Sequence, residues 1–324
     1  MDELKEFEIL CKTIGKKSKI NNCLFCGNMG AINSHSISKR FLREVAIDGS
    51  VYTVFRGENF PSLMLQKLHI NKASIQTNFC SKCDNELFEI LDNEDFDNSE
   101  DKLFLLAFRS ISSQLHTHKE ILKLMCNFKN IGKNINKYTL DNQQIKISEA
   151  QTVFDTMKQN LLSKNYLSIN NNIIVLNFAS NFIYSGCFPI IYDLFGRKTF
   201  DVENANLSPI FFNVFSENNK TYIIISWQND CQSKEYRKWF EQVNNMPLHN
   251  KLNYLSKLAI LNSENIYFNP HKYEKYNTCI KELLGKFIKT NYCWKIEDIY
   301  EFINCNMVFN IFEDKFDYRL TLLF

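Results

Sequence analysis

Two Cys-x-x-Cys pairs are the residues of this chain whose type and spacing most clearly point to chemistry. The first pair is Cys23 and Cys26, followed directly by Gly27, and the second pair is Cys80 and Cys83. A pair on a tight turn offers two sulfurs to one ion, so two pairs complete a tetrahedral shell of thiolates around zinc. A glycine after the first pair suits the sharp turn of a zinc knuckle, whose backbone amides point back at the sulfurs. The four cysteines are therefore predicted to hold one structural Zn²⁺.

A disulfide interpretation of the same cysteines is weaker. The other seven cysteines are scattered singly along the chain. Small secreted domains held together by disulfides carry a dense framework of paired cysteines instead. The separation between Cys26 and Cys80 is long for a zinc ribbon, so we expect a segment to be inserted between the two halves of the metal site.

A histidine and a carboxylate stand near the two cysteine pairs. His35 follows Cys26 by nine positions, and Asp84 comes directly after Cys83. In an arrangement where the first pair leads into a β-hairpin and the second pair starts a helix, a hairpin residue and one in the first helical turn face each other beside the zinc. His35 and Asp84 are predicted to form such a pair.

This pattern resembles the HNH, or ββα-metal, endonucleases that contain a structural zinc. In that family one Cys pair precedes a strand bearing Asp-His, and a second Cys pair is followed at once by a His or Asn on a helix. The resemblance implies that His35 is the general base that takes a proton from water, and that Asp84 is the helical ligand of a catalytic Mg²⁺ or Mn²⁺. Asn78 is the nearest candidate for the family's middle Asn, which orients the base. The resemblance covers only the N-terminal third of the chain.

The chain departs from the family pattern at Ser34, where the family more often has an aspartate that binds the metal. One metal ligand is therefore missing or comes from elsewhere. Asp84, Phe88 and Asp92 fall at i, i+4 and i+8 on one face of the expected helix, so Asp92 or Glu89 could support the metal directly or through a ligand. The chain is also similar in outline to uncharacterised bacterial proteins that carry Ser-His-x-Ile-x-Lys followed by Phe-Cys-x-x-(Cys/His)-Asp. Some of these are suspected of antiphage defence.

Charge is unevenly distributed, although the net charge is only +2. Residues 11–43 contain seven Lys or Arg and no acid, whereas residues 84–101 contain nine acids and no base. Phosphate binding depends on local basic density, so the sequence predicts nucleic-acid contacts on a short helix over 38–46, with a solvated helix face as the alternative. The acidic run is interpreted as a metal-holding helix start at Asp84 and a solvated loop from Glu94 onward. The predicted nucleic-acid contacts are Lys39, Arg40 and Arg43.

Composition and termini narrow the class of protein. The 324 residues are 45% hydrophobic and 14% aromatic, which is typical of a globular protein with a sizeable core. The sequence has no apolar run of about twenty residues, the length that a transmembrane helix needs. The N-terminus, Met1-Asp2-Glu3, lacks the basic start and apolar block of a signal peptide. Together with the scattered cysteines, these features predict a cytoplasmic protein.

The rest of the chain is predicted from periodicity and turn residues. A long helix should begin at Ser99 or Asp101, with His116 and His118 on its surface and Arg109 paired with the acidic run. The polar segment 127–142 is the expected domain boundary. The expected strands are 172–184, 187–194, 210–216 and 221–227, and the last two should form a hairpin. The expected helices are 148–162, 231–244, 248–261 and 276–290. A mixed segment that ends in 318–324 should follow them.

The sequence therefore predicts an α+β protein. Residues 1–130 should form a zinc-bound, treble-clef HNH-like module with a helical extension, and residues 131–324 an α+β domain for recognition, regulation or assembly. The predicted function is metal-dependent endonuclease activity, with DNA favoured over RNA, a protein partner at the C-terminal domain and no membrane contact. The alternatives are a non-catalytic zinc module that binds a partner protein and a zinc-ribbon nucleic-acid binder without cleavage. The chain lacks a Gly-rich phosphate loop, a Gly-x-Ser-x-Gly elbow and a His-Glu-x-x-His motif, which disfavours P-loop, esterase and zinc-protease chemistry.

Overall fold

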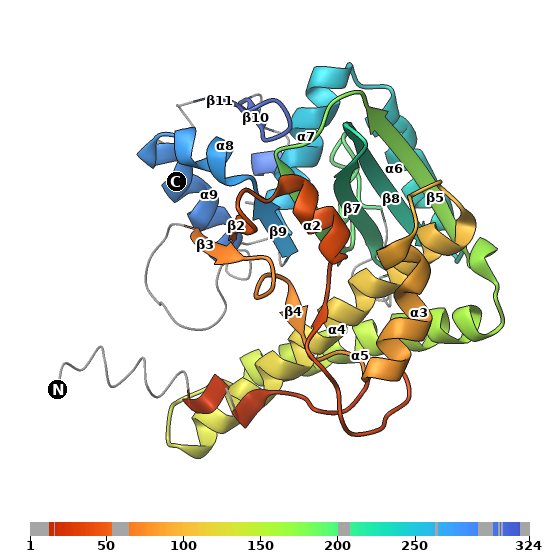
Figure 1. Ribbon diagram of the computed structural model, residues 1–324, viewed down its shortest axis with the longest axis vertical. Coiled ribbons are helices and arrows are strands. Elements are labelled where there is room, and N and C mark those ends of the chain that lie inside the picture. The colour runs from red at the N-terminus through yellow and green to blue at the C-terminus, as the bar shows by residue number, and fades with distance from the viewer. Residues whose placement is uncertain are drawn as a thin grey trace. The chain divides into compact units, whose positions relative to one another are not determined.

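The protein combines helices with antiparallel sheet, which confirms the α+β class (Figure 1). The computed structural model describes residues 13–15, 17–53, 65–199, 208–262, 265–290, 301–303, 305 and 307–317. Its residues fall into two compact units. The described residues of the first unit fall within 13–36 and 74–166, and those of the second fall within 37–53, 65–73 and 167–317.

The first unit carries two long helices that lie side by side, α4 (Glu100–Asn130) and α5 (Lys137–Leu162) (Figure 1). They pack through buried rings, and those of Phe108 and Phe154 stack with their centroids 5.2 Å apart. The start of the long helix is confirmed, with Ser99 at its N-cap. Because α4 and α5 share this apolar interface, both belong to the first unit. The units therefore do not follow the boundary expected after residue 130.

The connection between these two helices is shorter than the expected loop over 127–142. It spans only 131–136. Gly132 has φ +83°, a left-handed conformation that glycine adopts without steric cost. Asn136 then caps α5, because its side-chain oxygen accepts a hydrogen bond of 3.0 Å from the backbone N–H of Tyr138. The polar residues of this segment thus make a turn between two helices.

Short elements complete the described part of the first unit. Strand β1 (Ser34–His35) pairs antiparallel with β4 (Ile75–Gln76), with Ser34 opposite Gln76. Helix α3 (Ser81–Asn93) starts shortly after β4 and packs on α4, where the ring of Phe88 stacks on that of Phe108 at 6.5 Å. The segment between β1 and β4 contains residues of the second unit. The first unit thus joins parts of the chain that are distant in sequence.

The second unit is built on a seven-stranded antiparallel sheet in the order β3-β2-β9-β6-β7-β8-β5. The strands are β2 (Ser50–Thr53), β3 (Gln66–His69), β5 (Ile169–Leu176), β6 (Phe182–Phe188), β7 (Ile210–Glu217), β8 (Lys220–Gln228) and β9 (Asn265–Phe268). The short helix η1 (Tyr166–Ser168) joins α5 to β5. The other described elements of the second unit are α2 (Lys39–Val45), α6 (Ser233–Asn244), α7 (Leu248–Leu261), α8 (Pro270–Lys275), α9 (Thr278–Thr290), β10 (Phe309–Asn310) and β11 (Lys315–Phe316).

The core of the second unit lies between one face of this sheet and the helices that follow it. Side chains alternate across a strand, so Phe212 and Trp227 of the sheet face Trp239 of α6 and Leu255 of α7 in one apolar cluster. All four residues are at most 1% exposed. On the opposite face, α2 packs against β7.

Several sequence predictions for this unit are confirmed and two strand predictions are wrong. The hairpin is confirmed as β7 and β8, and the helix over 248–261 has the predicted bounds, as α7. The continuous strand over 172–184 is instead two strands, β5 and β6, separated by a turn in which Ser180 hydrogen-bonds the backbone. The strand over 187–194 is only the end of β6. The predicted C-terminal segment 318–324 lies outside the described residues.

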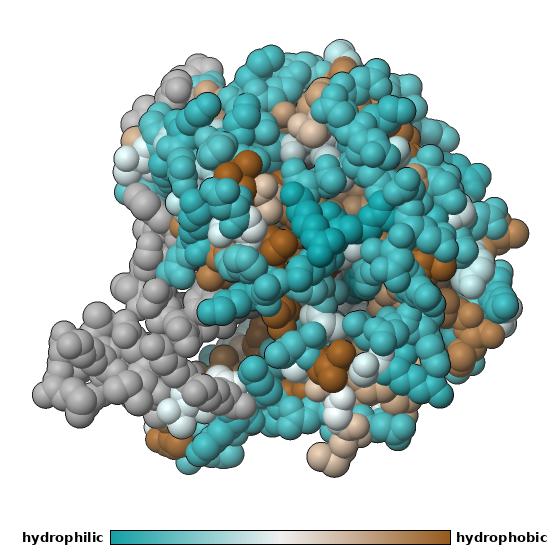
Figure 2. Space-filling model, in the orientation of Figure 1, coloured by the Kyte–Doolittle hydropathy of each residue, from teal (hydrophilic) through white to brown (hydrophobic). Residues whose placement is uncertain are grey.

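Apolar residues do not mark a membrane segment. In the described residues, no helix combines the length and apolar character needed to span a bilayer. The face of the molecule in Figure 2 is mainly hydrophilic, with hydrophobic residues in small separate groups.

Candidate metal centre

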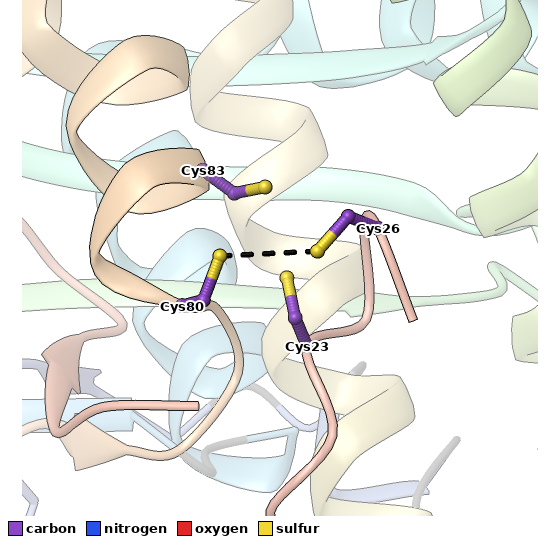
Figure 3. Close-up of side chains that lie close together, drawn as sticks. All are labelled: Cys23, Cys26, Cys80 and Cys83. Atoms are coloured by element: carbon purple, nitrogen blue, oxygen red, sulfur yellow. Dashed lines mark hydrogen bonds between the residues drawn. The ribbon is translucent and has the colours of Figure 1, made fainter. Parts of the chain in front are cut away.

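The first cysteine pair lies on a tight turn closed by backbone hydrogen bonds. The N–H of Gly27 donates to the carbonyl of Cys23 over 2.9 Å, and the N–H of Cys23 donates to the carbonyl of Asn28 over 2.8 Å. Gly27 has φ +78°, which a residue with a Cβ rarely adopts. The turn directs the sulfurs of Cys23 and Cys26 toward the second pair (Figure 3).

The second pair opens helix α3. Cys80 is the N-cap residue in an extended conformation, and its carbonyl accepts the N–H of Asp84 over 2.9 Å. Cys83 therefore lies in the first turn of the helix. The backbone also joins the two pairs, since the N–H of Leu24 donates to the carbonyl of Asn78 over 2.8 Å. Two local turns and this cross-link bring four sulfurs together.

The sulfur positions suit a tetrahedral metal. The four Sγ atoms all lie within 4.8 Å of one another, and those of Cys26 and Cys80 are 3.8 Å apart. Sulfurs about 2.3 Å from a tetrahedral Zn²⁺ are separated by about 3.8 Å. All four cysteines are free thiols, so no disulfide competes for them. The cluster could hold a structural metal ion such as zinc.

Burial and backbone hydrogen bonds set the state of these thiols. Burial raises the pKa of Cys23, but hydrogen bonds from the backbone N–H groups of Cys26, Cys80 and Phe25 outweigh it and lower the pKa to about 7. Burial, together with the neighbouring cysteine sulfurs, raises the pKa of Cys83. The backbone amides that lower the pKa of Cys23 agree with the expected turn, in which amides point back at the sulfurs. They favour a thiolate, the form that binds a metal.

The histidine and aspartate predicted beside the cysteines lie on β1 and α3. The Nδ1 atom of His35 is 3.0 Å from the hydroxyl oxygen of Ser74. Burial raises the pKa of Asp84, and the charge of Arg109 and a hydrogen bond from Ser34 lower it only in part. The Ser34 hydroxyl itself donates to the backbone carbonyl of Gln76 over 3.3 Å. No sequence signal pointed to Ser74, because the register of β1 and β4 decides which residue lies beside His35.

The second predicted carboxylate, Asp92, is engaged by an arginine. Its two oxygens accept from the two terminal nitrogens of Arg109, over 2.9 and 2.8 Å. The guanidinium also lies 4.0 Å from the ring centroid of Phe88, and the Arg109 side chain is only 5% exposed. The predicted pairing of Arg109 with the acidic run is confirmed. Asp92 thus holds α3 to α4, while the third candidate, Glu89, is exposed.

Asn78 is fixed by contacts around the cysteine cluster. It is 2% exposed, and its side-chain nitrogen donates to the side-chain oxygen of Gln76 over 3.0 Å. Its side-chain oxygen is buried without a hydrogen-bond partner among the described residues. Its backbone carbonyl receives the N–H of Leu24. Asn78 therefore links the knuckle to the segment before α3, and its predicted role in orienting His35 stays a prediction.

The predicted nucleic-acid contacts lie on α2 in the second unit. Arg40 forms an ion pair with Glu217, and their side chains are 18% and 7% exposed. The Arg40 guanidinium is thus engaged within its own unit. Lys39 is half-buried and Arg43 is exposed. Phosphate binding by these three residues stays a prediction.

The prediction that His116 and His118 are surface residues is wrong. They are 1% and 6% exposed. His116 Nε2 lies 3.2 Å from a carboxylate oxygen of Glu120, and Gln143 donates to the backbone carbonyl of His118 over 2.9 Å. The prediction failed because α4 packs against both α3 and α5, which buries almost every residue over 102–118.

Comparisons with protein-family models, curated proteins and solved structures found no match to this chain. The assignment of the site therefore depends on its own geometry. Within the described part of the chain, the four cysteines are the one group of three or more His, Cys, Asp or Glu residues whose ligand atoms lie close enough to share an ion. His35, Asp84 and Asp92 do not form a second such group.

Proposed function

We propose that the protein is a metal-dependent endonuclease of the HNH type, in which the cysteine cluster holds a structural zinc and His35 and Asp84 act on a nucleic-acid phosphodiester. The observation that carries this proposal is the placement of the two side chains. His35 lies on β1, and Asp84 lies in the first turn of α3, directly after Cys83 of the cysteine cluster. A role in antiphage defence rests on the resemblance alone and stays a prediction.

The order of elements supports the proposal. Along the chain, the cysteine turn, strand β1, strand β4 and a helix that begins at the second cysteine pair occur in the order expected of a treble-clef HNH nuclease, with α2, β2 and β3 inserted between the two strands. His35 lies on the first of these strands and Asp84 in the first turn of the helix. These positions match the general base and the helical metal ligand of that family.

The donor set is compatible with a catalytic Mg²⁺ or Mn²⁺. Such an ion is commonly bound by one or two carboxylates plus substrate phosphates and water, so Asp84 could serve as its protein carboxylate. When bound, the ion would stabilise charge that develops on the leaving oxygen. The Nδ1 atom of His35 lies 3.0 Å from the Ser74 hydroxyl oxygen, and with Nδ1–H as the donor in this contact Nε2 is the proton acceptor. His35 would thereby deprotonate the attacking water.

A plasmid-nicking assay with Mg²⁺ or Mn²⁺ tests the proposal. We expect His35→Ala to lose roughly 10²–10⁴-fold in cleavage rate, the usual cost of removing a general base, while it keeps its zinc and its melting temperature. Asp84→Ala should also lose activity, but a higher Mg²⁺ or Mn²⁺ concentration should restore part of it. His271→Ala is the matched control, because His271 is an exposed histidine of the second unit and should leave cleavage unchanged.

A non-catalytic zinc module for binding a partner is the second candidate. It is favoured by Ser34 in the position of a metal-binding aspartate and by the bidentate contact of Asp92 with Arg109. This candidate is correct if the wild-type protein cleaves no substrate across a broad screen of metals, DNA and RNA. It is also favoured if His35→Ala releases zinc and melts early, since His35 would then support the fold of the cysteine site.

A further inference from the structure

The end of α4, the turn after it and the start of α5 are rich in lysine and free of acids. Residues 121–140 contain four lysines and no Asp or Glu. The four lysines, Lys123, Lys129, Lys133 and Lys137, are all exposed. This excess of positive charge on one short stretch contrasts with a net charge of +2 for the whole chain.

A second acid-free segment is attached to the same end of the helix pair. Residues 13–22 also contain no Asp or Glu, and Lys17 and Lys19 are exposed. The Lys123 ammonium donates to the carbonyl of Lys19 over 2.8 Å, and the Asn127 side chain donates to the Ser18 hydroxyl over 3.0 Å. Figure 1 shows this red segment beside the yellow helices. Six lysines from two distant parts of the sequence therefore gather in the first unit.

These six ammonium groups lack the acidic partner that several other lysines of the protein have. Within the described residues, none of them lies within 4.0 Å of a carboxylate. By contrast, Lys67, Lys238 and Lys272 have acidic partners at 3.3, 2.8 and 3.2 Å. A cluster of cations without internal counterions attracts a polyanion and gains further from the release of the counterions of that polyanion.

Other groups on this surface suit nucleic acid. Tyr138, next to Lys137, is 70% exposed, which is unusual for an aromatic side chain that could be buried. An exposed ring can stack on an unpaired base, and base stacking on aromatics is tolerant of sequence. Asn130, at the end of α4, and Asn134, on the turn, are exposed. Their side chains can donate to phosphate or sugar oxygens. Asp141 is the nearest acid that follows along α5.

We propose that residues 123–138, which span the end of α4, the turn and the start of α5, form a nucleic-acid-binding surface together with residues 17–19. We call it the lysine surface. Its lysines contact phosphates, and Tyr138 stacks on a base where the strand is unpaired. The lysine surface includes neither the predicted contacts on α2 nor His35. It requires no cleavage by the protein, so its test is independent of the endonuclease proposal.

Fluorescence anisotropy with a labelled oligonucleotide, as single strand and as duplex, tests the lysine surface in buffer without added divalent cation. Replacement of Lys123, Lys129, Lys133 and Lys137 with Gln should weaken binding by roughly 100-fold or more at low salt and make the dependence of log Kd on log salt shallower by about 3, since each phosphate contact contributes about 0.7–0.9 to the slope. Zinc content and melting temperature should stay as in the wild type, because these side chains are exposed.

A charge-matched control separates the surface from net charge. The control variant replaces four exposed lysines of the second unit with Gln, and should keep the wild-type affinity and salt slope. The control positions are Lys234, Lys238, Lys272 and Lys275. Equal weakening by both variants, or an unchanged salt slope in the first, would overturn the proposal. Displacement of the oligonucleotide by polyglutamate at equal charge concentration would also overturn it, in favour of an acidic protein partner.

Tyr138→Ala sharpens the assignment. Loss of a stacked ring should weaken single-strand binding by roughly tenfold and leave duplex binding unchanged, because duplex bases are already stacked. Phe195→Ala is the matched control, since Phe195 is an aromatic of the second unit with 73% of its surface exposed. Equal losses on single strand and duplex would contradict stacking by Tyr138.

Discussion

The cysteine end of the first unit and the sheet of the second unit are held together in different ways. Around the cysteines the strands are two residues long, and residues 26–30 of the turn are all exposed. In the sheet, all eight residues of β7 are buried. The first region therefore has little apolar burial to offset the entropy lost on folding, whereas the second has a large core. We infer that a metal ion supports the first region and apolar packing the second.

The largest expected effect is loss of the metal. About 10 kcal/mol of binding free energy is available from a structural zinc, and it is coupled to folding because the site exists only in the folded chain. We therefore expect one zinc per chain in the purified protein, and we expect Cys80→Ser or a strong chelator to unfold the segments around the cysteines. Hydrogen–deuterium exchange should increase in 20–35 and 75–90, with β7 and β8 still protected.

Cys126→Ser is the matched control for this experiment, because Cys126 is an exposed free cysteine outside the cluster. It should keep its zinc and its exchange pattern. A metal-free protein in which both cysteine turns are as protected as in the wild type would refute the dependence on metal.

A cavity in the sheet core should produce the next largest effect, and in the opposite unit. Phe212 is 0% exposed, and its ring centroid lies 5.1 Å from that of Tyr184. Phe212→Ala should reduce the free energy of unfolding by about 3–5 kcal/mol, as for other large-to-small core changes, while zinc stays bound. Chemical denaturation and metal analysis measure the two quantities. Release of zinc by this variant would contradict the comparison, because it would show that the metal site also depends on the sheet core.

A smaller effect should come from a carboxylate in the second unit. Burial tends to raise the pKa of Asp193, but hydrogen bonds from Gln242, from Arg197 and from the backbone N–H of Phe195 outweigh it and leave the pKa below its usual value. Ionised Asp193 therefore stabilises the folded state at neutral pH, and this stability is lost as the pH falls below about 4 toward the folded pKa. Asp193→Asn should cost about 2 kcal/mol at pH 7, as for hydrogen bonds to a charged group, and progressively less at acidic pH. A loss that does not change between pH 7 and pH 3 would contradict this linkage.

The sequence predicted those features that depend on neighbouring residues. The two cysteine turns, α7 and the β7–β8 hairpin each follow from a local pattern of spacing, periodicity or turn residues. The cysteine cluster could be predicted as one site because two CxxC turns leave few other arrangements of four thiolates. In each cysteine turn, in α7 and in the β7–β8 hairpin, the deciding interactions lie within a short stretch of the chain.

Features that depend on distant packing could not be predicted. The contact between His35 and Ser74 follows from strand register, and no local pattern encodes it. His116 and His118 fit an amphipathic helix with one exposed face, yet α4 is covered from two sides. The lysine surface also escaped prediction, because its two segments are adjacent only through the contacts of Lys123 and Asn127 with residues 18–19.

The interleaved path of the chain has a consequence for dividing the protein into fragments. The chain enters the second unit after Ser36, contributes α2, β2 and β3, and is back in the first unit from Ser74 to Tyr166. No single cut in the gene yields either unit complete. A fragment that starts at residue 167 would lack two of seven strands and leave β9 without its β2 neighbour. A fragment that ends at 166 would carry α2 and two strands without the sheet they join. Truncation is therefore a poor route to either unit. Excision of the segment between Ser36 and Ser74, or a circular permutant, is the better route.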